Sequence, residues 1–253
     1  MMEARSANGK IYFASDLHLG FPDAAQSLER ERRFVRWLDF IAADASQLFL
    51  LGDLFDFWFE YRQVVPRGFV RLLGKLAELS DSGIRLHVFS GNHDQWMTDY
   101  LTQELQATVY HGPQRMELHG KRFLLAHGDG LGPGDHGYKW LKKIFSNPTA
   151  RWLFARLHPN FGVWLGKRWS RNNRLLNGEE QAEFLGADKE WLIHYARQQL
   201  EREFIDYFVF GHRHIMLTFP LSPTSTLITL GDWLSHNSYA VYEGTTVRLL
   251  TFS

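Results

Sequence analysis

The chain has 253 residues, with 28 acidic and 28 basic side chains and no cysteine. This length suffices for one large domain or for a domain with an inserted cap. The balanced charge argues against a generic polyanion binder, and the lack of cysteine excludes disulfides, thiolate metal sites and cysteine nucleophiles. Imidazole nitrogens and oxygen atoms are left as ligands for any metal ion.

The first ninety or so residues alternate between short apolar runs and amphipathic helical patterns. Strands are predicted at 11–15, 48–51 and 86–90, because each range is a short apolar run that ends in polar residues or glycine. Helices are predicted at 29–44 and 70–79, where apolar residues recur every three or four positions. This order favours right-handed parallel crossovers in an α/β domain.

The second half of the chain contains further strand patterns. A hairpin is predicted from 115–118 to 122–127, around the turn His119-Gly120. Four more strands are predicted at 207–210, 226–230, 239–242 and 247–252. The fold class is therefore α/β (α+β), and a two-sheet β-sandwich flanked by helices fits the order better than one open sheet. We expect one domain over 1–253.

A helical cap is predicted as an insertion at 136–178. This segment has no acidic residue but nine lysines and arginines, interleaved with tryptophan and phenylalanine. In one interpretation the rings line a groove for acyl chains, and the cations face phosphates or an anionic membrane surface. In the other, the rings pack on the core and the cations extend into water. Nucleic acid is not expected as a partner, because the patch is compact and the net charge is balanced.

Five short polar motifs follow predicted strands, at the chain positions where ligand sites collect in α/β proteins. They are Asp16-x-His18, Gly52-Asp53-x-x-Asp56, Gly91-Asn92-His93-Asp94, His127-Gly128-Asp129 and Gly211-His212-Arg213-His214. In an extended strand residues i and i+2 lie on the same face, so each Asp-x-His or His-x-His pair is expected to reach one ion or two adjacent ions.

The chemistry of these side chains favours a pair of divalent cations. Imidazole, carboxylate and amide ligands suit manganese, iron, cobalt or zinc, whereas sets made only of oxygen suit magnesium or calcium. Few carboxylates against two divalent ions leave a positive site, which suits a phosphate substrate. Two such ions can activate a water and clamp the oxygens of an in-line displacement.

Taken in order, the five motifs resemble those of the calcineurin-like metallophosphoesterases, and the resemblance extends from Asp16 to His214. It implies a β-sandwich with helices on both sides and two divalent metal ions, with manganese expected first and iron, cobalt, zinc or magnesium as alternatives. The implied ligands are Asp16, His18 and His214 for one metal, Asn92, His127 and His212 for the other, and Asp53 between both. His93 is implied as the donor to the phosphoryl group, oriented by Asp94.

A closer resemblance is to the UDP-2,3-diacylglucosamine hydrolases of lipid A synthesis. It rests on Gly52-Asp53-Leu54-Phe55-Asp56-Phe57-Trp58, on His127-Gly128-Asp129 through Asp135-x-x-Tyr138, and on the helical insertion before the last motif. It implies attack on the UMP phosphorus, which releases UMP and a 1-phospho diacylglucosamine. The implied substrate contacts are Asn92, His93, Asp135, Tyr138, Ser170, Arg171, Asn172, Arg174 and His212. The chain departs from well-known members by having His93 where they have arginine.

Several alternatives accompany these expectations. The chain could be a general soluble phosphodiesterase or phosphatase, or a scaffold of the same fold without catalysis, although the seven implied ligands are all present. Asp56 and Asp94 have a second interpretation, as turn formers that support the ligands. The first ten residues lack an apolar secretory signal, so a cytoplasmic protein, peripheral on the inner face of the membrane, is expected. No protein partner is implied.

Overall fold

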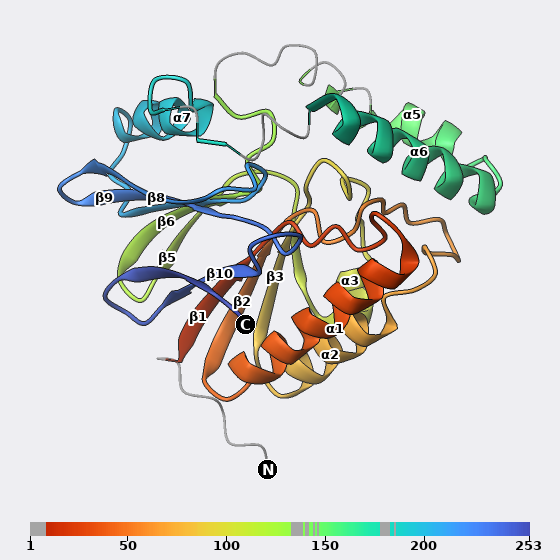
Figure 1. The fold of residues 1–253 in the computed structure, drawn as a ribbon, viewed down its shortest axis with the longest axis horizontal. Helices are drawn as coiled ribbons and strands as arrows, with labels where there is room; N and C mark the ends of the chain where they lie inside the picture. The colour runs from red at the N-terminus through yellow and green to blue at the C-terminus, as the bar shows by residue number, and fades with distance from the viewer. Residues whose placement is uncertain are drawn as a thin grey trace.

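Two sheets lie face to face in the computed structural model, with helices on both outer sides (Figure 1). The structure describes residues 9–132, 139, 142–143, 145, 147–177, 183–184 and 186–253, with only the backbone for 171–177. This arrangement confirms the two-sheet sandwich predicted from the sequence.

The first sheet has six strands in the order β11-β10-β1-β2-β3-β4. Strands β1 to β4 pair in parallel, and β10 and β11 extend the sheet antiparallel on the other side of β1. Their bounds are β1 Lys10–Ala14, β2 Ala45–Leu51, β3 Arg85–Phe89, β4 Thr108–Tyr110, β10 Ser238–Tyr242 and β11 Val247–Thr251. Parallel pairing places the carboxyl ends of β1, β2 and β3 at one edge of the sheet.

The second sheet has five strands in the order β5-β6-β7-β9-β8. Strand β7 pairs in parallel with β6 and β9, while β5 and β8 close the two sides antiparallel. Their bounds are β5 Gln114–Leu118, β6 Lys121–Ala126, β7 Tyr207–Phe210, β8 Met216–Ser222 and β9 Ser225–Leu230.

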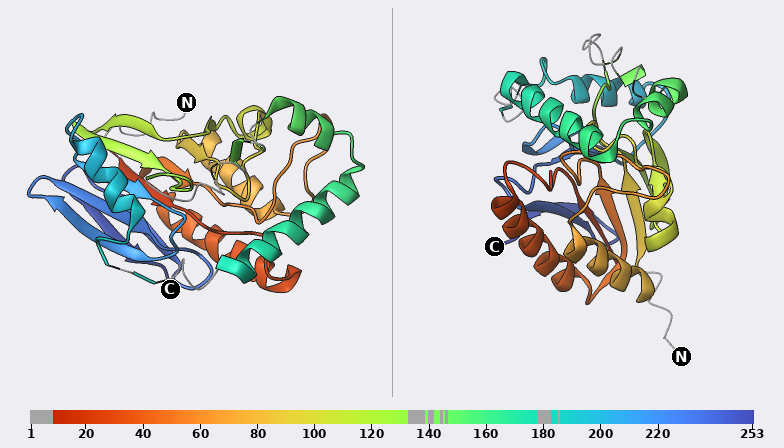
Figure 2. Two further views of the ribbon diagram at one scale, coloured as in Figure 1. Left: turned by 90° about the horizontal axis from the view of Figure 1, so that it is seen from above. Right: turned by 90° about the vertical axis from the view of Figure 1, so that its right-hand side faces the viewer.

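The helices cover both outer faces of the sandwich and one end of it. Their bounds are α1 Ala24–Ile41, α2 Val70–Asp81, α3 Tyr100–Leu105, α5 Pro148–Phe154, α6 Pro159–Asn177 and α7 Trp191–Leu200. Helices α1 to α3 pack on the first sheet and α7 on the second. Helices α5 and α6 lie beyond the strand ends, apart from both sheets (Figure 2).

Strand β1 shows how the sequence sorts residues between the layers. Ile11 and Phe13 are fully buried against the second sheet, whereas Tyr12 and Ala14 face the helices on the other side. Alternate residues of a strand point to opposite faces, so a strand buried on both faces is apolar throughout. This is why β1 appears in the sequence as a continuous apolar run.

Several elements differ from the sequence prediction, and helices α3 and α7 were not predicted. Helix α1 begins at Ala24 rather than at residue 29, because the Asp23 carboxylate accepts hydrogen bonds of 2.9 Å from the backbone N–H groups of Ala25 and Gln26. Strands β4 and β8 were not predicted. Strand β4 has three residues, and β8 contains Pro220, which is tolerated there because β8 is an edge strand.

The cap predicted at 136–178 coincides in part with α5 and α6. Its limits remain a prediction, because the range includes residues outside the described part of the chain. Among the described residues, no helix combines the length and the apolar composition needed to cross a membrane.

Candidate metal centre

The loops that follow β1, β2, β3, β6 and β7 bring residues from all five sequence motifs together. The side chains of His18 and His214 meet although they are 196 positions apart, and those of His127 and Asn92 meet across 35 positions. The two sheets run so that the carboxyl ends of these strands lie at the same end of the sandwich, below α5 and α6 (Figure 1). The convergence expected from parallel strand ends is therefore present.

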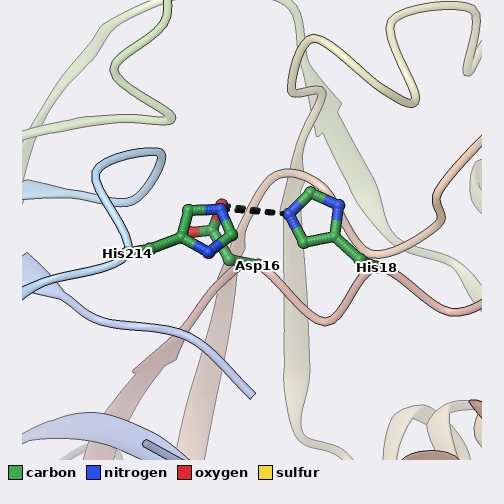
Figure 3. Close-up of side chains that lie close together, drawn as sticks. All are labelled: Asp16, His18 and His214. Carbon is green, nitrogen blue, oxygen red and sulfur yellow. Dashed lines mark hydrogen bonds and ion pairs between the residues drawn. The ribbon is translucent and has the colours of Figure 1, made fainter. Parts of the chain in front are cut away.

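One cluster consists of Asp16, His18 and His214 (Figure 3). The two imidazole Nε2 atoms lie 3.2 Å apart. Asp16 Oδ1 lies 3.7 Å from His18 Nε2 and 3.4 Å from His214 Nε2. Asp16 is fully buried, and within the described chain its Oδ1 atom accepts no hydrogen bond. Three potential ligand atoms therefore face one small volume.

A second cluster consists of Asp53, His127 and His212, with Asn92 beside it. His127 Nε2 lies 3.3 Å from Asp53 Oδ2 and 3.2 Å from Asn92 Oδ1. Asp53 Oδ2 also lies 3.7 Å from His18 Nε2 in the first cluster. The Asp53 carboxylate is thus the side chain that contacts both groups.

The hydrogen bonds around His127 test whether this cluster fits a cation. His127 Nδ1 lies 2.7 Å from the Leu51 carbonyl oxygen, which can only accept, so Nδ1 carries a proton. The Nε2 atom then faces two oxygens, Asn92 Oδ1 and Asp53 Oδ2. Three electron-rich atoms this close repel unless a proton or a cation lies among them. The donor set, nitrogen with carboxylate and amide oxygen, is one that divalent transition metals prefer.

The pKa values of the buried histidines are consistent with a cation bound at the second cluster. Although burial opposes it, the Asp53 and Asp16 carboxylates raise the pKa of His127 to about 10. Burial lowers the pKa of His212 to about 3, which keeps that imidazole neutral and able to coordinate a metal. The clusters therefore combine buried carboxylates with a neutral imidazole, and a bound cation can balance the carboxylates.

Most of the candidate ligands have an unusual backbone conformation. The φ angles of Asp16, His18, Asp53, His212 and His214 are 58°, 44°, 53°, 68° and 51°. Residues other than glycine rarely adopt these left-handed values, at a cost of about 1–2 kcal/mol each. The expectation that the pairs Asp16/His18 and His212/His214 project from extended strands is therefore wrong: tight loops aim these side chains. Strain concentrated at such residues is typical of functional sites.

Asp232 supports the first cluster and was not predicted. Its Oδ2 atom lies 3.1 Å from His214 Nδ1, and its Oδ1 atom accepts hydrogen bonds of 2.7 and 3.1 Å from the backbone of Ser235 and His236. The carboxylate can only accept from His214 Nδ1–H, so His214 Nε2 is directed at Asp16. The signal was available in the sequence, because Gly231-Asp232 follows strand β9 as Gly52-Asp53 follows β2.

Asp94 has a different position from the one implied by the resemblance. Its carboxylate accepts hydrogen bonds of 2.7 Å from the backbone N–H groups of Gly91 and Leu54, and longer ones from Asp53 and Phe55. Within the described residues it makes no hydrogen bond to the His93 ring. Burial, together with the nearby Asp53 carboxylate, raises the pKa of Asp94 to about 7. Asp94 holds the turn that carries Asp53 rather than orienting the His93 side chain directly.

His93 is instead contacted by Asp56 and by Ser170 of α6. His93 Nδ1 lies 2.9 Å from Ser170 Oγ and 3.2 Å from the Asp56 carbonyl oxygen. The His93 and His18 rings are nearly perpendicular, with centroids 4.8 Å apart. Of the implied substrate contacts, the structure brings Asn92, His93, Ser170 and His212 to the clusters.

The remaining implied substrate contacts cannot be placed against the site. Asp135 and Tyr138 lie outside the described residues. Arg171, Asn172 and Arg174 belong to α6, where only their backbone is described. Their roles remain predictions.

Comparisons with known proteins agree with this geometry. Residues 9–216 match the model of the family described as calcineurin-like phosphoesterase. The chain is 44% identical over 252 residues to a protein of Porphyromonas gingivalis named UDP-2,3-diacylglucosamine hydrolase, covering 95% of this chain and 96% of that protein. A protein of the same name from Aeromonas hydrophila subsp. hydrophila is 30% identical over 236 residues, covering 90% and 92%.

Among solved structures, the chain is similar to that of Yfce, a phosphoesterase from E. coli, with a TM-score of 0.46 and 15% identity over 96% of this chain and 92% of that one. The extent of the family match, with the 44% identity along nearly the whole chain, decides the assignment. The chain belongs to the calcineurin-like phosphoesterase family of metal-dependent hydrolases, and its relatives include proteins named UDP-2,3-diacylglucosamine hydrolase.

Proposed function

We propose that the protein hydrolyses the pyrophosphate bond of UDP-2,3-diacylglucosamine and releases UMP and 2,3-diacylglucosamine 1-phosphate. The observation that supports this best is the 44% identity, over 95% of the chain, to a protein named UDP-2,3-diacylglucosamine hydrolase. A match of this extent includes the cap helices as well as both sheets. The cap is where a lipid-linked substrate would need binding surface beyond the phosphates.

Family membership implies divalent metal ions, and the two clusters are where we propose that they bind. Asp16, His18 and His214 would hold one ion, Asn92, His127 and His212 the other, and Asp53 both. When bound, two such cations neutralise phosphoryl charge and lower the pKa of the attacking water. Manganese is the metal we expect, with iron, cobalt, zinc or magnesium as alternatives.

The chain's own residues would orient the phosphates and complete the charge balance. We propose that His93 donates a hydrogen bond to the phosphoryl oxygens or the leaving group. Its backbone N–H donates to Asp53 Oδ1 at 2.9 Å, which fixes the residue beside the clusters. A donor held in place before the reaction requires no reorganisation during it, which is how preorganised groups stabilise transition-state charge.

We propose that exposed aromatic and basic side chains of the cap attach the protein peripherally to the inner face of the membrane. Trp152 and Trp164 expose 55% and 54% of their surface, and the guanidinium groups of Arg156 and Arg168 lie over these rings at 4.7 and 5.9 Å. About half of the surface of each of these two rings is therefore left unpacked, which favours the first interpretation of the cap over packing on the core. Exposed aromatic rings with cations and no acidic residue over 136–178 suit an anionic lipid surface.

Binding to vesicles tests this attachment. Replacing both Trp152 and Trp164 with alanine should weaken cosedimentation with phosphatidylglycerol-containing vesicles by roughly tenfold or more, because each ring loses its apolar contact with the lipid. Phe40→Ala is the matched control, because Phe40 is 56% exposed on α1, away from the cap. Equal binding of all three proteins would contradict a cap-mediated attachment.

The substrate is tested with detergent-dispersed UDP-2,3-diacylglucosamine in ¹⁸O-labelled water, beside bis-p-nitrophenyl phosphate. We expect efficient release of UMP that carries the label, because attack falls on the UMP phosphorus. Turnover of bis-p-nitrophenyl phosphate without release of UMP would show a general phosphodiesterase instead.

A further inference from the structure

Ser170 links the cap to the reaction centre through His93. We propose that Ser170 is a positioning residue, which fixes the ring of His93 so that its Nε2 atom is free for the phosphoryl group. This inference rests on the role proposed above for His93, and it replaces the expectation that Ser170 is primarily a substrate contact.

The Ser170 hydroxyl is enclosed by protein groups. Ser170 is 7% exposed and Asp56 is 4% exposed. Ser170 Oγ lies 2.8 Å from Asp56 Oδ1 and 2.9 Å from His93 Nδ1. Both partners lie far away in sequence, by 114 and 77 positions, so the contact exists only because α6 is docked on the loops that follow β2 and β3.

The protons available to Asp56, Ser170 and His93 determine which group donates in each hydrogen bond between them. A serine hydroxyl has one proton, and the Asp56 carboxylate is the stronger acceptor, so Ser170 donates to Asp56. The Ser170 oxygen then accepts from His93 Nδ1–H. The Asp56 carbonyl oxygen, 3.2 Å from the same nitrogen, can also only accept. Both contacts therefore require a proton on Nδ1, and no hydrogen bond within the described chain involves His93 Nε2.

The close approach of α6 makes this contact possible. Gly166 is one helical turn before Ser170, and a methyl group at Gly166 would overlap the ring of Phe57. Phe57 directly follows Asp56 in the sequence. The helix therefore rests on the loop that also supplies the Asp56 contact, and residues four apart lie on the same helix face. Docking of α6 on Phe57 and the hydrogen bond of Ser170 to Asp56 thus reinforce each other.

A consequence of the proposal is that the cap, besides covering the substrate, positions the ring of His93. If α6 moves away from Phe57, His93 loses one of the two acceptors that hold Nδ1–H, and the ring can rotate. Binding of substrate under the cap would then coincide with correct placement of His93. The arrangement is specific to a chain that has histidine at position 93.

Kinetics of single and double variants tests the proposal on UDP-2,3-diacylglucosamine and on bis-p-nitrophenyl phosphate. Ser170→Ala should lower kcat by about ten- to a hundredfold, with KM changed by no more than about twofold, the size expected when an orienting partner is removed. In a His93→Ala background, Ser170→Ala should cause no further loss, because the two residues act as one unit. Thr149→Ala, which removes an exposed cap hydroxyl, is the matched control.

Two kinetic results would overturn the proposal: equal losses from Ser170→Ala in both backgrounds, or a rise in KM with kcat unchanged, which would indicate a substrate contact. Measuring both substrates distinguishes a failure of the Ser170 proposal from a failure of the proposed function. Lack of UMP release would refute the lipid substrate, whereas the coupling between Ser170 and His93 is still measured on the second substrate.

Imidazole ¹⁵N NMR of the zinc-loaded protein provides a readout independent of turnover, with the His93 signals identified by their loss in His93→Gln. We expect a proton on Nδ1 in the wild type and a changed His93 signal in Ser170→Ala but not in Thr149→Ala. A wild-type Nδ1 without a proton, or an unchanged signal in Ser170→Ala, would contradict the inference.

Discussion

Asp53→Asn should lower turnover by about a thousandfold or more and reduce the bound metal from two ions to one or none. The reason is the position of the carboxylate, which lies 3.3 Å from His127 Nε2 and 3.7 Å from His18 Nε2, between the two clusters. Asparagine keeps the shape but removes the negative charge that both cations would share. Losing an electrostatic contact to the transition state costs about a hundred- to a thousandfold, and loss of a metal adds to this.

The measurement combines kcat with elemental analysis after equilibration in excess manganese. Asp44→Asn is the control, because the partly exposed Asp44 pairs with Lys10 and accepts a hydrogen bond from Tyr12, away from the clusters. Near-normal turnover of Asp53→Asn in added manganese, with two ions still bound, would contradict the proposed role of Asp53.

Glu190→Ala should destabilise the protein by about 3–5 kcal/mol, the cost typical of leaving a buried charge without its partner. Arg213 is fully buried, and its Nε and Nη2 atoms lie 3.0 and 2.7 Å from the Glu190 carboxylate oxygens. The guanidinium also lies over the Trp191 ring, 4.7 Å from its centroid. Because Arg213 stands between His212 and His214, we expect loss of metal affinity together with loss of stability.

Urea unfolding at fixed metal concentration measures this effect. Glu243→Ala is the control, because Glu243 pairs with Arg248 at the surface, where an ion pair contributes about 1 kcal/mol or less. The double variant Arg213→Met with Glu190→Leu should recover much of the stability, since no buried charge is left unpaired. If Glu190→Ala lowers the free energy of unfolding no more than Glu243→Ala does, the buried pair does not hold the loop that carries His212 and His214.

The sequence was sufficient to predict the layers of the fold and the convergence of the motifs. Apolar runs such as Leu48 to Leu51 mark strands buried on both faces, and consecutive parallel strands end at the same edge. This physical rule predicts that Asp16, Asp53 and Asn92 lie close together. The short strand β4 and the edge strand β8 were not predicted, because their local sequence patterns are weak.

The supporting contacts could not be predicted in the same way. The left-handed backbone at Asp16 and His214 depends on how loops pack against other loops, and local propensity disfavours it. The contact of Ser170 with His93 depends on the docking of α6 on Phe57. Asp94 was expected beside the His93 ring, but its carboxylate is used by the backbone N–H groups of the neighbouring turn. Such contacts are set by tertiary packing, which spacing along the chain does not reveal.

Anomalous diffraction from a crystal of the protein grown with manganese tests the central claim most directly. We predict two peaks, about 3.5–4 Å apart as in other two-metal hydrolytic sites. One should lie among Asp16, His18 and His214, and the other among Asn92, His127 and His212, with Asp53 touching both. A single peak, or manganese bound elsewhere while these side chains contact only one another, would contradict the account.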